Sequence, residues 1–134
     1  MNHETEISVR FCETDMAGHV NNTSYFIYLE EARGKFFDQV IPDDPEIREG
    51  FILASTNCDF LGQSYFNQRL VVMTRISKIG TKSFSFNQII RAAETGAMIA
   101  EAEATIVCFD YEAQKTVPIT PALRNVLEGL LVTS

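Results

Sequence analysis

The sequence predicts an α+β fold in which one antiparallel sheet curves around a single long helix. A strongly apolar helix is indicated over residues 22–40, and four segments rich in β-branched and aromatic residues follow it. Glycines between these segments suit the short turns that join antiparallel strands. Because a lone helix with a broad apolar face must bury that face, we expect the sheet to wrap around it.

Length, composition and charge limit the kinds of protein that this chain can be. Its 134 residues, of which 46% are hydrophobic and 22% charged, predict one domain over residues 1–134 with a substantial core. The net charge of −7 argues against a nucleic-acid partner and against an anionic membrane surface. Most acidic side chains lie in residues 1–67, so we expect an anionic ligand to contact the second half.

The cysteines and the first residues bear on the compartment. Cys12, Cys58 and Cys108 are odd in number and widely spaced, which does not fit a secreted disulfide framework. Each lies in a strand-like stretch, so we expect small buried side chains. The polar start of the chain does not resemble a signal peptide, and no run reaches the ~18 apolar residues that span a bilayer. We therefore expect a cytoplasmic protein without a membrane partner.

The first half of the chain predicts a strand, a turn-rich break and the long helix. Ile7, Val9 and Phe11 alternate with polar residues, as in a strand. Turn-forming residues fill 13–20, and side-chain oxygens that can cap a helix follow over 21–24. The helix has apolar residues every three or four positions: Tyr25, Leu29, Ala32, Phe36 and Val40. Gly34 inside it costs about 1 kcal/mol relative to alanine, so we expect another backbone to approach closely there.

The second half predicts the sheet. The expected strands cover 51–61, 69–79, 82–93, 98–110 and a short stretch near 114–119, and a terminal helix covers 121–130. Ala100, Ala102 and Ala104 share one face of their strand, which suits the close approach of a helix or another sheet. We expect a second subunit to cover this alanine face, because a sheet around one helix leaves an edge and an outer face exposed.

Candidate chemistry is concentrated just before the long helix. The first N–H groups of a helix are unpaired and carry about half a positive charge, so N–H groups near Asn22 can bind an oxygen that becomes negative during a reaction. Asp15, on the preceding loop, is placed to attack a substrate or to activate water. The structural alternatives are a turn-forming role for Asp15, a hydrogen-bonding role for His19 and helix capping for the two asparagines.

The pattern D-x-x-x-H-V-N-N, followed by Y-F-x-Y-L-E-x-A-R over 25–33, resembles the hotdog-fold acyl-CoA thioesterases of the 4-hydroxybenzoyl-CoA type. The order of the predicted elements and the ending V-P-I-T-P over 117–121 extend this resemblance along almost the whole chain. The resemblance implies hydrolysis of acyl-CoA, with Asp15 as nucleophile or general base. It also implies that the substrate contacts His19, Asn22 and Tyr25.

The resemblance carries two further expectations. Some family members hold the phosphates of coenzyme A with basic residues in the turn before a strand that begins K-S-F, and the matching residues here are Lys78, Lys82 and Ser83. The family also assembles as homodimers or homotetramers whose active sites are shared between two chains. Because thiolate is a good leaving group and no residues show metal-ligand spacing, we expect neither a cofactor nor a metal.

Two other functions remain open at this stage. A hydratase or dehydratase of the same fold also uses an aspartate and a histidine, but the four-residue spacing of Asp15 and His19 before the long helix favours hydrolysis. The other alternative is a hotdog protein that binds acyl groups without turnover. Release of free thiol from acyl-CoA distinguishes hydrolysis from both.

Overall fold

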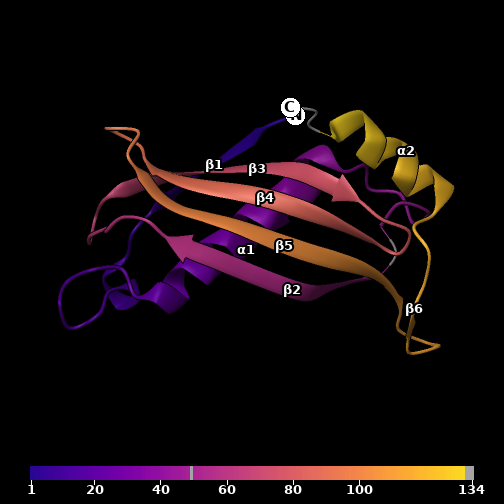
Figure 1. The fold of residues 1–134 in the computed structure, drawn as a ribbon, viewed down its shortest axis with the longest axis horizontal. Coiled ribbons are helices and arrows are strands. Elements are labelled where there is room, and N and C mark those ends of the chain that lie inside the picture. Colours follow the sequence, from indigo (N-terminus) through magenta and orange to yellow (C-terminus); the bar gives the residue numbers. More distant parts are fainter. Residues whose placement is uncertain (49, 132–134) are drawn as a thin grey trace.

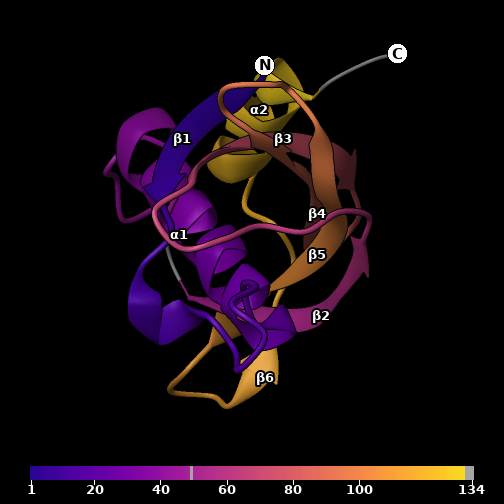
Figure 2. The same cartoon turned by 90° about the vertical axis from the view of Figure 1, so that its left-hand side faces the viewer.

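The computed structural model describes residues 1–48 and 50–131, and it confirms an antiparallel sheet that curves around one long helix (Figure 1). The sheet follows the order β1-β3-β4-β5-β2, and every neighbouring pair is antiparallel. Its strands are β1 (His3–Ser8), β2 (Phe51–Phe60), β3 (Arg69–Ile79), β4 (Ser83–Ala92) and β5 (Met98–Asp110), and the short β6 (Lys115–Thr116) pairs with β5. Figure 2 shows the strands wrapped around α1 (Asn22–Val40). A terminal helix, α2 (Pro121–Leu130), follows as predicted.

The inner face of α1 packs against the sheet as the sequence spacing predicts. Tyr25, Leu29, Ala32 and Phe36 are all buried, and the first three belong to one core cluster with Ala100 and Ala102. The small side chains of β5 therefore let the chain's own helix approach the sheet. The expectation that a second subunit covers the alanine face is wrong, because α1 covers it within the chain.

The outer face of α1 is exposed, and Phe26 and Ile27 lie on it. Gly34 also faces outward, and a Cβ atom added there would meet nothing within 4 Å. The expected close approach of another backbone at Gly34 is therefore absent from the described residues. Within residues 1–48 and 50–131, no helix has the length and hydropathy needed to cross a membrane.

The start of the chain differs from the predicted strand. β1 ends at Ser8, and residues Phe11–Glu13 form a short 3₁₀ turn, η1, that leaves Phe11 exposed. The side chain of Glu13 accepts the Arg10 N–H and closes this turn, which ends the strand alternation. Cys12 is exposed on the same turn and not buried as expected, whereas Cys108 is buried and Cys58 is half-buried.

Candidate active site

The Asp15 loop, residues 14–20, is narrow and held by its own hydrogen bonds. A β-bridge joins Thr14 to Val20, and the Asp15 N–H donates to the His19 carbonyl at 2.7 Å. The Oδ1 atom of Asp15 accepts the N–H groups of Ala17 at 2.9 Å and His19 at 3.2 Å, so Asp15 does form the turn. The Oδ2 atom accepts no hydrogen bond from the residues that the structure describes, and the side chain is exposed. One oxygen thus fixes the carboxylate, and the other is available to a ligand.

The start of α1 leaves one backbone donor available. Asn21 caps the helix, because its side-chain oxygen accepts the Thr23 N–H at 3.0 Å and its carbonyl accepts the Ser24 N–H at 2.9 Å. The Asn21 N–H donates to the Glu13 carbonyl at 2.9 Å. For the Asn22 N–H, by contrast, the described part of the chain provides no acceptor. This unpaired donor lies at the positive end of the helix dipole, where it favours an oxygen that gains negative charge.

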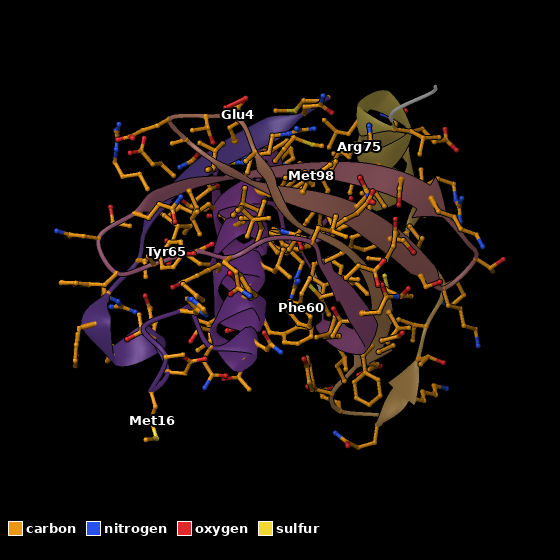
Figure 3. All side chains as sticks on the ribbon, turned by 60° about the vertical axis from the view of Figure 1, so that its left-hand side comes forward. Glu4, Met16, Phe60, Tyr65, Arg75 and Met98 are labelled. Atoms are coloured by element: carbon orange, nitrogen blue, oxygen red, sulfur yellow. The ribbon has the colours of Figure 1, made fainter. Side chains whose placement is uncertain are left out.

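The loop before β3, residues 61–68, holds the Asp15 loop from the other side. His19 forms a β-bridge with Tyr65, and the two rings meet edge to face with centroids 5.1 Å apart. The Val20 N–H donates to the Ser64 carbonyl at 2.8 Å. Figure 3 shows Met16 at the tip of the Asp15 loop, pointing away from the rest of the chain. His19 is thus fixed at the base of the loop, beside the exposed Tyr65.

Tyr25 lies beneath this surface. It is 2% exposed, and its hydroxyl donates to the Ser64 Oγ at 3.0 Å. Burial raises the pKa of Tyr25, so the phenol stays neutral. Its ring also contacts Phe60, with centroids 5.7 Å apart. Tyr25 therefore forms part of the wall between α1 and the 61–68 loop.

A buried carboxylate beside the Asp15 loop was not singled out from the sequence. Glu13 is 5% exposed and accepts hydrogen bonds from Arg10 and from the Tyr28 hydroxyl. Burial raises the pKa of Glu13, but the hydrogen bonds from Arg10 and Tyr28 outweigh burial, and the net pKa is lowered. The three-residue spacing of Arg10 and Glu13 is a sequence signal for this pair, although it does not reveal that the carboxylate is buried.

Exposed apolar side chains surround the same region, which we call the loop end (residues 10–25 and 61–68). Phe11 packs edge to face on Phe66, and Phe26 packs on Phe60 at the adjoining end of β2. All four of these rings are exposed by more than a third of their area. This apolar surface suits an acyl chain or another protein surface.

The lysine turn, residues 78–83, lies far from the loop end. Lys78 is near the end of β3, Lys82 is in the turn and Ser83 begins β4, and both lysines are exposed. β3 begins just after the 61–68 loop and has 11 residues, which at about 3.3 Å each separate its ends by roughly 33 Å. Figure 1 shows the two regions at opposite ends of the long axis. One chain thus does not bring Asp15 and the lysines together, and its described part holds no metal-binding group of His, Cys, Asp or Glu side chains.

The sequence profile of the Thioesterase-like superfamily matches residues 9–127, and the chain belongs to this superfamily. The long-chain acyl-CoA thioesterase FadM of Escherichia coli is 28% identical over 133 residues, which cover 96% of this chain and 98% of FadM. The acyl-acyl carrier protein thioesterase ATL2 of Arabidopsis thaliana is 35% identical over 117 residues, covering 85% of this chain and 62% of ATL2.

Solved structures show the same hotdog fold. A predicted thioesterase from Bacillus stearothermophilus superposes with a TM-score of 0.88 and 27% identity, over 100% of this chain and 99% of that one. A Thermus thermophilus thioesterase complexed with coenzyme A and Zn superposes with a TM-score of 0.82 and 25% identity, over 94% and 91% of the two chains. The residues that match the superfamily profile, 9–127, include the Asp15 loop, all of α1 and the sheet from β2 to β5.

Proposed function

We propose that the protein hydrolyses acyl-CoA thioesters to the free acid and coenzyme A, as a member of the 4-hydroxybenzoyl-CoA thioesterase type. The observation that carries this proposal is a pair of groups at the loop end that have no partner within residues 1–48 and 50–131, the Asp15 Oδ2 atom and the Asn22 N–H. The similarity to FadM, which is a long-chain acyl-CoA thioesterase, supports the substrate class. An exposed Cys12 thiol suits a reducing compartment, and the cytoplasm is the proposed location.

The proposed chemistry needs only protein groups and water. The thioester carbonyl accepts a hydrogen bond from the Asn22 N–H, which draws electrons from the carbonyl carbon. Asp15 then attacks that carbon and expels the thiolate, giving a mixed anhydride that water hydrolyses. Alternatively, Asp15 takes a proton from a water that attacks the carbon directly and expels the thiolate. His19 is proposed to contact the substrate beside Asp15, and Tyr25 to shape the wall beneath it.

We further propose that the active site is completed by a second copy of the chain. β2 is an edge of the sheet, pairs only with β5 within the described residues, and has mostly exposed side chains. Antiparallel pairing of two β2 edges creates a twofold axis perpendicular to the sheet, which reverses the direction of the partner. The partner's lysine turn then lies at the same end as this chain's Asp15. A homodimer, or a homotetramer of two such dimers, thus lets Lys78, Lys82 and Ser83 serve as coenzyme A contacts.

Thiol release from a panel of aliphatic and aryl CoA thioesters tests the proposed hydrolysis. Asp15→Asn keeps the shape of the side chain and removes its charge and basicity, so kcat should fall by roughly two to four orders of magnitude while KM changes little. Asp38→Asn, on the exposed face of α1, is the matched control and should keep the parent kcat.

Three results would each contradict this proposal or its assignment of Asp15. Near-parental thiol release by Asp15→Asn would remove its catalytic assignment. Acyl-CoA binding without any thiol release by the parent would favour the non-catalytic binding protein. The ultraviolet change of an enoyl-CoA without thiol release would favour the hydratase.

A further inference from the structure

Glu13 is a buried anion whose two oxygens are both fully engaged. Its Oε1 atom accepts the Arg10 N–H at 2.8 Å and the Tyr28 hydroxyl at 2.9 Å. Its Oε2 atom accepts the Arg10 Nε at 3.1 Å and Nη2 at 2.7 Å. Four donors from two residues, Arg10 and Tyr28, therefore hold one carboxylate, and the Arg10 cation balances its charge.

The main chain of Glu13 joins the two arms of the Asp15 loop. Its carbonyl accepts the Asn21 N–H at 2.9 Å and the Ser24 hydroxyl at 3.0 Å. Together with the Tyr28 contact, these bonds fix Glu13 to the N-cap residue and to the first two turns of α1. The residue two positions before Asp15 is thus attached to the helix whose first N–H groups are part of the proposed site.

The hydrogen bonds of Asp15 itself have a different effect. Among the residues that the structure describes, its carboxylate accepts N–H groups only from Ala17 and His19, which belong to the same loop. Those bonds fix the shape of the loop but not its position relative to α1. The position depends on the bonds that hold the residues at the two ends of the loop. On the α1 side these are the contacts of Glu13, the residue just before the loop, with Asn21, Ser24 and Tyr28.

Building on the proposed thioesterase function, we propose that Glu13 is a positioning residue. It holds the Asp15 carboxylate and the Asn22 N–H in the relative position in which both can act on one thioester. A misplacement of about 1 Å can reduce a rate by about a hundredfold. Glu13→Gln keeps the size of the side chain but removes its charge and directs an amide N–H₂ toward Arg10. We expect kcat to fall by about ten- to a hundredfold and KM to stay within about twofold.

A double-mutant cycle distinguishes positioning from general destabilisation. Tyr28→Phe removes a hydroxyl that donates to Glu13, so its loss of kcat should not add to that of Glu13→Gln in the double variant. Glu6→Gln is the control, because it removes the 3.1 Å surface ion pair with Arg69 and should keep the parent kcat. Full additivity, or a rise in KM equal to the fall in kcat, would overturn the proposal.

Amide hydrogen exchange provides a readout that does not depend on activity. Glu13→Gln should speed exchange at the N–H groups of Asp15, His19 and Asn21, and should leave β3 and β4 unchanged. If the parent releases no thiol, the proposed function fails, and exchange alone still decides whether Glu13 orders the loop. Unchanged loop exchange, or faster exchange throughout the sheet, would overturn the proposal. If Glu13→Gln does not fold, Tyr28→Phe should show the same local effect.

Discussion

The loop end and the lysine turn differ in how their functional side chains are held. At the loop end, backbone and side-chain bonds fix both arms of the Asp15 loop. One carboxylate oxygen of Asp15 and the Asn22 N–H have no partner among the residues that the structure describes. At the lysine turn, the Gly80 N–H donates to the Ser83 carbonyl at 2.7 Å, but the side-chain amines of Lys78 and Lys82 donate to no acceptor in the described ranges. Bond-making chemistry needs fixed geometry. A lysine can bind a phosphate as a point charge on a flexible stem.

The two regions also occupy opposite ends of the same strand, so they can serve one substrate only if two chains combine. If the lysines bind the same substrate as Asp15, the active site must therefore be assembled from two chains. Variants can alter the loop end, the lysine turn or the β2 edge separately, and so test this requirement.

Among the variants that probe the two ends and the β2 edge, breaking the edge should have the largest effect after Asp15→Asn. Lysines on an edge strand prevent edge-to-edge pairing, so Ser55→Lys with Asn57→Lys should give a monomer by light scattering. Because each site would lose the partner's lysine turn, kcat/KM should fall by about a hundredfold, from the loss of several charge-assisted contacts. The same pair of lysines on the exposed face of α1, at Glu31 and Asp38, is the control. A monomer with parental kcat/KM would contradict the shared site.

Removing one lysine should affect only substrates that carry the nucleotide. Lys82→Ala should raise KM for acyl-CoA by about tenfold, as expected for one exposed charge-assisted contact. KM for a short acyl thioester without the nucleotide should not change, nor should kcat for either substrate. Lys115→Ala, on β6, removes a charge elsewhere and is the matched control. Equal effects on the two substrates would separate Lys82 from coenzyme A.

Acid should weaken the loop end through Glu13. Burial raises the pKa of Glu13, but hydrogen bonds from Arg10 and Tyr28 bring it below its ordinary value of 4.5. The unfolded chain then takes up this proton at a higher pH than the folded chain does. The stability from Glu13 is therefore present above pH 4.5 and lost as the pH falls through the lower folded pKa. In urea titrations, Glu13→Gln should cost stability at neutral pH and show a shallower loss below pH 4.5. An unchanged acid slope would contradict this role.

Glycine substitutions should have the smallest effects on stability in α1 and larger effects near the other end of the sheet. Gly34 is exposed on α1 with open space around it, so Gly34→Ala should stabilise the protein by about 0.5–1 kcal/mol. At Gly50, just before β2, an added Cβ would overlap the carbonyl oxygen of Phe109, so Gly50→Ala should lower Tm. A stabilised Gly50→Ala would show that this end adapts more readily than its packing indicates.

The sequence predicted the helices and strands better than it predicted what packs against them. The three- and four-residue spacing in 22–40 identified α1 and its buried face, because that signal is local. The same spacing did not show what covers Ala102, since the choice between the chain's own helix and a second subunit depends on the curvature of the sheet. Phe11 was misplaced because the Glu13 side chain closes a turn that strand alternation does not reveal. The distance between Asp15 and Lys82 follows from strand order, which no local motif encodes.

A mixed dimer tests most directly whether the two ends form one site across two chains. Chains carrying Asp15→Asn and Lys82→Ala, each with a different affinity tag, are co-expressed and the mixed dimer is isolated. If the site is shared, one site of this dimer has both mutations and the other has neither. A shared site predicts about half of the parental kcat, because one of two sites is intact, with the parental KM for acyl-CoA. If the mixed dimer instead has the raised KM of the Lys82→Ala homodimer, Asp15 and Lys82 act within one chain. That result would contradict a site shared between two chains.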